Sequence, residues 1–190
     1  AALSRMAQAP AAVVVNSEYG RDYMASRGYA GARWRVIPNG FDTAQFRPDV
    51  DARRRIRSEW GLDGDQTLVG LVARMDPVKD HVTFLEAARL LAERDTETRF
   101  VCVGSGNERF EAQLRDLSVS KGIADRVVWA GTRTDIASVN CALDIATCCS
   151  VSESFPNVIG EAMACGVPCV VTDVGDAARL VGDTGTVIQP

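Results

Sequence analysis

The sequence is poor in the residue types on which several classes of function depend. It has one histidine, His81, and six cysteines that never form a CxxC pair. Metal sites need clustered ligands and disulfide frameworks need characteristic cysteine spacings, so we expect neither. The cysteines stand in apolar segments such as FVCVG, which predicts buried free thiols in a reducing cytosol. His81 follows Lys79 at the start of a predicted helix, and we interpret it as a surface or N-terminal-turn residue.

Long apolar runs and an excess of positive charge are also absent. No window offers the roughly 18 to 20 uninterrupted apolar residues that a membrane-spanning helix needs. The net charge of -4 provides no electrostatic argument for binding nucleic acid or an anionic membrane. We therefore expect a cytoplasmic protein that holds any anionic ligand through local contacts. Because the first residue is not methionine, we interpret the chain as a piece of a longer protein.

Short valine-rich runs alternate with amphipathic segments along most of the chain. Helices are predicted over 82–94, where apolar residues recur every three to four positions, and over 108–122, which ends on Gly122. This alternation is typical of an α/β fold with a Rossmann-like, doubly wound parallel sheet, which binds ligands at the carboxyl ends of its strands. The predicted strands are 12–15, 67–73, 99–103, 126–130, 143–148 and 168–172.

One turn-rich segment, VIPNGFDTAQFRPDV at 36–50, interrupts this alternation, and we interpret it as a connector between two folding units. The larger unit is predicted over 36–190. Residues 1–35 contain an apolar strand whose edge is predicted to be unpaired, so we expect them to pack poorly and to favour dimerisation. The basic run ARRRIR, 52–57, is interpreted as a solvated helix face.

Two cations flank the turn that follows the predicted strand 67–73. Arg74 comes directly after the strand, and Lys79 stands at the start of the next helix. This arrangement suits a diphosphate, although the spacing alone favours a pair of solvated loop cations. The following strand opens into a turn with Gly104, but the GSG sequence lacks the third glycine of a dinucleotide fingerprint and favours a plain strand-to-helix turn.

The stretch SVSESFPNVIGEAMACGVP, 150–168, predicts a short helix preceded by a loop. Ser152 and Ser154 can cap this helix, and Pro156 suits its first position. The free amides near Asn157 and Val158 would then form an anion site at its N-terminus.

Two glutamates stand eight residues apart around this helix. Glu153 precedes it, and Glu161 is predicted on its second turn, facing the sheet. A carboxylate accepts hydrogen bonds from vicinal hydroxyl groups, which would assign one glutamate to a sugar and the other to a ribose. The alternatives are a loop charge for Glu153 and, for Glu161, a favourable acidic residue near a helix N-terminus.

Five segments in order resemble the retaining GT-B glycosyltransferases known as glycosyl transferases group 1: IPNGFDTAQFRP, RMDPVK, VGSGNERF, VWAGTRTDI and ESFPNVIGEAMACGVPCVVTDVG. The resemblance covers nearly the whole chain, and its most specific part is the pair of glutamates followed by EAMACGVP. It implies the C-terminal, nucleotide-sugar-binding half of a two-domain enzyme. Residues 1–35 would be a remnant of the N-terminal acceptor domain with the linker, and 36–190 a donor domain truncated at its C-terminus.

The resemblance also implies roles for individual residues. Arg74 and Lys79 match the diphosphate-binding cations and Glu153 the glutamate near the donor sugar, which together would be the catalytic set. Glu161 matches the ribose-binding glutamate, and the turn at 131–133 matches the place where main-chain groups read the base. The full donor-binding set is Gly104, Gly131, Arg133, Phe155, Pro156, Asn157, Val158 and Glu161. One mild departure is Ala73, which stands where a glycine commonly precedes the arginine.

The function implied is transfer of a sugar, with retention, from a nucleotide diphosphate sugar to an unidentified acceptor. The cations and the helix N-terminus would stabilise the departing diphosphate, so we expect no metal and no cofactor. This piece alone is expected to bind without turnover. The alternatives are a nucleotide-sugar 2-epimerase of the same fold, which a single histidine supports weakly, and a non-catalytic nucleotide-binding module.

Overall fold

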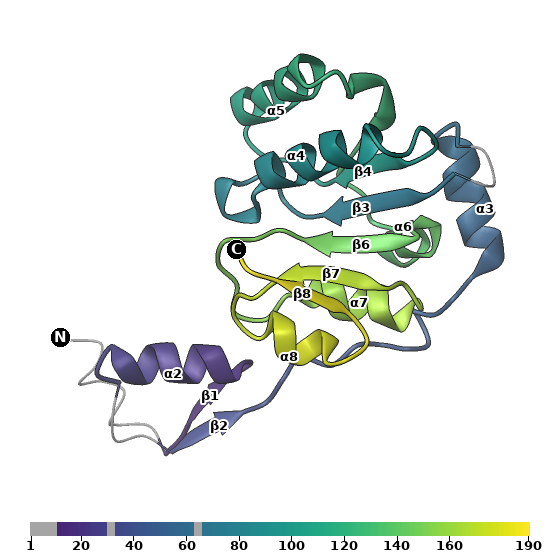
Figure 1. Ribbon diagram of the computed structural model, residues 1–190. Helices are drawn as coiled ribbons and strands as arrows, with labels where there is room; N and C mark the ends of the chain where they lie inside the picture. The colour runs from purple at the N-terminus through teal and green to yellow at the C-terminus, as the bar shows by residue number, and fades with distance from the viewer. Residues whose placement is uncertain (1–10, 30–32, 63–65) are drawn as a thin grey trace.

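The computed structural model describes residues 11–29, 33–62 and 66–190, and its main element is a six-stranded parallel sheet (Figure 1). β3 (Leu68–Val72) lies at its centre, with Leu68 opposite Arg99 of β4 and Val69 opposite Ile145 of β6. The predicted fold class is confirmed. The spatial order is β5 (Val127–Gly131), β4 (Arg99–Val103), β3, β6 (Ile145–Cys148), β7 (Cys169–Thr172), β8 (Thr186–Ile188).

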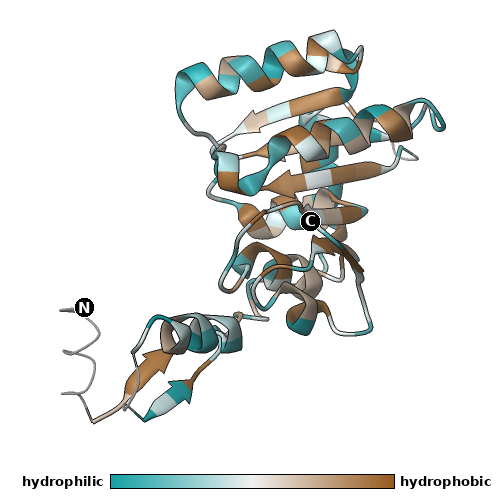
Figure 2. Cartoon of the chain, turned by 60° about the vertical axis from the view of Figure 1, so that its left-hand side comes forward, coloured by the Kyte–Doolittle hydropathy of each residue, from teal (hydrophilic) through white to brown (hydrophobic). Residues whose placement is uncertain are grey.

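Two hydrophobic clusters lie on opposite faces of this sheet. Successive residues of β4 alternate between them: Phe100 and Cys102 pack in one cluster, Val101 and Val103 in the other. Figure 2 shows the apolar residues concentrated along the strands. The first cluster receives α4 (His81–Ala92) and α5 (Glu108–Ser120), and the second receives α3 (Val50–Glu59), α6 (Ile136–Ala142), α7 (Asn157–Ala164) and α8 (Ala177–Val181).

The six predicted strands are all present, within two residues at each end. Continuous apolar runs mark the five of them that lie in the main sheet, because hydrophobic clusters cover both faces of that sheet. Helix α5 ends as expected, with Gly122 at a φ of 69° just beyond its C-terminus. Two three-residue strands were not predicted, β8 and β2 (Trp34–Val36), because so short a segment carries no readable period.

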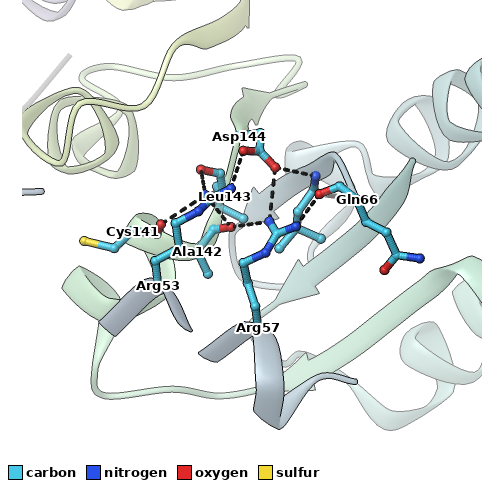
Figure 3. A network of polar contacts seen from close by, with 8 residues as sticks. Arg53, Arg57, Gln66, Cys141, Ala142, Leu143 and Asp144 are labelled. Atoms are coloured by element: carbon cyan, nitrogen blue, oxygen red, sulfur yellow. Dashed lines mark hydrogen bonds and ion pairs between the residues drawn. The ribbon is translucent and has the colours of Figure 1, made fainter. Parts of the chain in front are cut away.

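The basic run in α3 is not a solvated helix face, as the sequence had suggested. Ile56 is fully buried, and Arg57 is only 5% exposed. Asp144 binds both Arg53, at 2.6 Å, and Arg57, at 3.1 Å, and accepts a hydrogen bond from the Leu68 amide at 2.8 Å (Figure 3). Arg53 also donates to the carbonyl groups that end α6. The network therefore locks α3 against the start of β3 and the end of α6.

A smaller unit precedes the connector. β1 (Val13–Val15) pairs in parallel with β2, and α2 (Glu18–Ser26) connects them beside the main body (Figure 1). The predicted poor packing is confirmed for the body of α2, which has no buried residue, but it is wrong at the start of that helix. There Ser17 is fully buried and makes specific hydrogen bonds with the larger unit. Residues 1–10 and 30–32 lie outside the described residues.

None of the helices in the described ranges is long and apolar enough to cross a membrane.

Candidate functional site

A crevice site is expected where the strand order of the sheet reverses. β3 lies between β4 and β6. The helix after β3 packs on one face of the sheet and the helix after β6 on the other, so a topological switch point lies between these two strands. The two loops meet there, since the amide of Val151 donates to the carbonyl of Val78 at 2.9 Å. This contact joins the segment that carries Arg74 and Lys79 to the segment that carries Glu153.

Lys79 and Glu153 form an ion pair across this junction. Lys79 ends a short 3-10 turn, Pro77–Lys79, whose start is capped by the Asp76 side chain on the Val78 amide at 2.9 Å. Glu153 also accepts a hydrogen bond from the Ser150 hydroxyl at 2.7 Å. The two charged side chains are 23% and 12% exposed, so solvent screens their attraction less than at an open surface.

Arg74 stays apart from this pair. Its side chain is exposed and has no hydrogen bond or ion pair within the described ranges. It lines a depression of about 470 Å³ together with Ser105, from the turn after β4, and Phe110, from the first turn of α5. A free guanidinium beside a hollow at the sheet edge is available to an anionic ligand.

The turn after β4 requires glycine at position 104 because the backbone of the neighbouring turn lies close to it. A β-carbon at Gly104, which has a φ of 134°, would lie 2.0 Å from the carbonyl oxygen of Ala73. The Gly104 amide donates to the carbonyl of Gly131 at 2.8 Å, and the hydroxyl groups of Ser105 and Thr132 are 2.6 Å apart. The turns after β3, β4 and β5 therefore form one continuous edge, and the GSG turn is explained by backbone packing.

The side chain of Arg133 is bound by two carboxylates of the protein itself. Its guanidinium is bound bidentately by Asp135, at 2.9 and 2.8 Å, and also pairs with Glu59 at the end of α3. The hydrogen bonds that the guanidinium donates to Asp135, and then those to Glu59, raise the pKa of Arg133. The groups of this turn that remain open to a ligand are those of the main chain.

The helix that follows Glu153 begins one residue later than predicted. α7 starts at Asn157, Pro156 is its N-cap residue rather than its first helical residue, and neither Ser152 nor Ser154 caps it. Without a capping side chain, the first-turn amides, including those of Asn157 and Val158, keep their capacity to bind an anion.

The connector packs against the start of α7. The ring of Phe155 stacks on that of Phe41 at 6.3 Å, and the Asn157 side-chain oxygen accepts from Asn39 at 2.8 Å. A β-carbon at Gly160 would lie 2.0 Å from the ring of Phe41. Only glycine therefore allows the connector to lie this close to the helix that carries Glu161.

Glu161 stands on the second turn of α7, as predicted. Its side chain is half-buried, and burial raises the pKa of its carboxyl group. In the described part of the chain nothing donates a hydrogen bond to it or pairs with its charge, and no hydrogen bond joins it to Lys79, Glu153 or Arg74. A partly desolvated carboxylate with no partner is unfavourable unless a ligand pairs with it.

A groove of about 690 Å³ separates the two units beside Glu153. One wall is the segment 152–154, and the other comes from β1 and α2, where Tyr19 and Tyr23 stack at 6.2 Å. Sequence reasoning missed this groove because it depends on how the smaller unit docks.

His81 is the first residue of α4, as the sequence suggested, but it is not a surface residue. It is fully buried, and burial lowers its pKa to about 4, so the ring is neutral at pH 7. Neither ring nitrogen has a hydrogen-bond partner among the described residues. Over the same ranges, no group of three or more histidine, cysteine, aspartate or glutamate side chains is arranged to hold a metal ion.

The sheet order, the two flanking layers and the crevice define a Rossmann-like α/β domain of the kind found in GT-B proteins. The chain belongs to the family of glycosyl transferases group 1, which it matches over residues 66–190. The family and the GT-B fold that the five sequence segments predicted are thereby confirmed.

Individual relatives cover most or all of the chain. D-inositol 3-phosphate glycosyltransferase of Mycobacteroides abscessus is 37% identical over 180 residues, 92% of this chain and 39% of that protein. GDP-mannose-dependent alpha-(1-6)-phosphatidylinositol monomannoside mannosyltransferase of Mycolicibacterium smegmatis is 32% identical over 206 aligned positions, 99% of this chain and 51% of that protein.

A solved structure is also closely similar. Anabaena HepE in complex with UDP and glucose superposes with a TM-score of 0.91 at 26% identity, over 100% of this chain and 52% of that one. The chain thus spans about half the length, or less, of these three proteins.

Proposed function

We propose that this chain is the donor-binding half of a glycosyltransferase that transfers a sugar, with retention, from a nucleotide diphosphate sugar to an acceptor. Family membership and the UDP and glucose bound by HepE support this proposal. The observation that carries it is the Lys79–Glu153 pair at the switch point between β3 and β6, where open α/β sheets bind their ligands.

The diphosphate would lie between the turn after β3 and the start of α7. Arg74 offers a free guanidinium, and α7 offers its uncapped amides. Lys79 pairs with Glu153, so the phosphate oxygens would compete for its ammonium group and leave the carboxylate to the hydroxyl groups of the donor sugar. These positive groups would stabilise the charge that develops on the departing diphosphate, which requires neither a metal nor a protein nucleophile.

The nucleoside would occupy the adjoining positions. We assign the ribose to Glu161, whose unpaired carboxylate would gain hydrogen bonds from the two hydroxyl groups. The base would meet the main chain around Gly104, Gly131 and Arg133, whose guanidinium is already bound. Main-chain contacts discriminate little between bases, and the relatives accordingly include a protein named for GDP-mannose and one with bound UDP.

The two units receive different roles. Residues 1–35 would belong with the linker to an acceptor-binding domain, residues 36–190 would form the donor domain, and catalysis would take place in the cytosol. A 2-epimerase of the same fold, which would need an accessible histidine, is disfavoured because His81 is buried.

Ligand-induced stabilisation tests the proposal. We expect one of UDP, GDP, ADP and dTDP to raise the melting temperature, corresponding to about 2.7 kcal/mol at a hundredfold excess over Kd. Lys79→Ala should reduce this shift. Lys121→Ala is the matched control, because Lys121, just after the end of α5 and away from the crevice, also pairs with a glutamate, Glu86 of α4. If none of the four diphosphates stabilises the protein, the donor-site proposal is wrong.

A further inference from the structure

Asp176, which no sequence motif had singled out, joins the two folding units. It lies just before α8 and is 5% exposed. One carboxylate oxygen accepts a hydrogen bond from the amide of Glu18 at 2.8 Å, and the other accepts from the amide of Tyr19 at 2.9 Å. These are the first two amides of α2, so a negative charge is bound at the positive end of that helix.

The serine before α2 completes this junction. The hydroxyl oxygen of Ser17 accepts from the Gly20 amide at 2.8 Å and lies 2.7 Å from the hydroxyl oxygen of Ser154. Ser17 is fully buried although no residue within α2 itself is buried. The docking of α2 is therefore concentrated at its first turn.

The same junction holds the backbone on which Glu153 stands. The amide of Asp176 donates to the carbonyl of Ser154 at 3.1 Å. At Gly175, which has a φ of 58°, a β-carbon would lie 2.4 Å from the carbonyl oxygen of Glu153. Residues 175 and 176 thus fix the path of 153–154 from one side while the first turn of α2 contacts it from the other.

We propose that Asp176 is a positioning residue that couples the docking of α2 to the placement of the Glu153 carboxylate. It touches neither Glu153 nor Lys79 through its side chain, and it acts through the backbone of the segment between the two units. The role assigned to Glu153, facing the sugar of the donor, rests on the function proposed above. Loosening the junction would then weaken recognition of the sugar and leave the diphosphate contacts of Arg74 and α7 unchanged.

Binding of a nucleotide with and without its sugar tests the coupling. Calorimetry would compare UDP with UDP-glucose, or GDP with GDP-mannose if GDP is the better ligand. For Asp176→Ala we expect the preference for the sugar nucleotide over the bare diphosphate to fall by about tenfold, while the Kd of the diphosphate stays within about threefold of the wild-type value. Asp176→Asn keeps one acceptor oxygen and should give an intermediate loss.

A merely structural role would change both ligands alike or neither. Asp173→Ala is the matched control, because Asp173 lies on the same turn with an exposed side chain. Amide hydrogen exchange provides a reading that needs no ligand. The amides of Glu18 and Tyr19 should exchange about ten to a hundred times faster in Asp176→Ala, since each loses a hydrogen bond to a charged acceptor.

The outcomes separate the two proposals. If the wild-type protein binds no nucleotide or nucleotide sugar, the proposed function fails and the positioning role fails with it. If the wild type prefers the sugar nucleotide and Asp176→Ala keeps that preference, only the positioning role is overturned. Ser17→Ala alters the same junction on the side of the smaller unit. If that variant also keeps its preference for the sugar nucleotide, this negative result is confirmed.

Discussion

Replacement of Glu161 by glutamine should weaken nucleotide binding and stabilise the free protein at the same time. Burial raises the pKa of the Glu161 carboxyl group in the folded state. The contribution of this group to stability is therefore most favourable below its unfolded pKa and is lost as the pH rises through the folded pKa. At pH 7, above the ordinary pKa of a glutamate, burial of this carboxyl group is a net cost that Glu161→Gln removes, so the melting temperature without ligand should rise.

The loss of binding follows from the hydrogen bonds that a ribose would donate. A hydrogen bond to a charged acceptor contributes about 1.5 to 3 kcal/mol, so the Kd of the diphosphate should rise by about ten- to a hundredfold in Glu161→Gln. Glu153→Gln should behave differently because it frees Lys79 for the phosphates. Its diphosphate Kd should stay within about threefold of wild type or fall, and only its preference for a sugar nucleotide should disappear.

Calorimetry with the best diphosphate, and thermal unfolding without ligand, would measure the two effects. Glu108→Gln is the control, since Glu108 is exposed at the start of α5. Equal losses of diphosphate affinity in the two glutamate variants would show that their roles are wrongly assigned. A lower melting temperature for Glu161→Gln would refute the argument that the free carboxylate is unsatisfied. An unchanged diphosphate Kd in Glu161→Gln would remove Glu161 from the site.

Three further changes test the scaffold. Asp144→Ala should lower the free energy of unfolding in urea by about 2 to 4 kcal/mol, because it leaves Arg57 charged and 5% exposed without this partner. Gly160→Ala should cost about 1 to 3 kcal/mol through its clash with Phe41, whereas Gly40→Ala, with nothing within 4 Å, should be neutral or slightly stabilising. Stability should fall as the pH drops from about 6.5 to 4, by up to about 3 kcal/mol, because only the unfolded chain protonates His81 readily; His81→Leu should show a flatter pH profile.

Five of the six strands of the main parallel sheet were predictable because their composition alone marks them. Residues 99–103 were predicted with the bounds that β4 has in the structure, since buried strands need continuous apolar residues. That Lys79 lies near Glu153 could also be predicted from the sequence, because the carboxyl ends of parallel strands share one edge of the sheet.

Pairings between distant segments could not be predicted in the same way. The bonds of Asp144 to α3 join residues 87 and 91 positions apart, and those of Asp176 to α2 span more than 150. No local period or spacing encodes such partners. The burial of Arg57 and His81 was missed for the same reason, since both look polar in sequence and are covered only by tertiary packing.

The division of the core into two clusters also bears on the order in which the chain folds. The buried members of the cluster beneath α4 and α5 all lie between Val69 and Val127, whereas those of the other cluster extend from Ala52 to Val181. Closing short loops loses less chain entropy than closing long ones. The half of the sheet from β3 to β5 can therefore condense early from one contiguous stretch, and the half that carries Glu153 and Glu161 completes its packing only when α3 joins strands drawn from far along the chain.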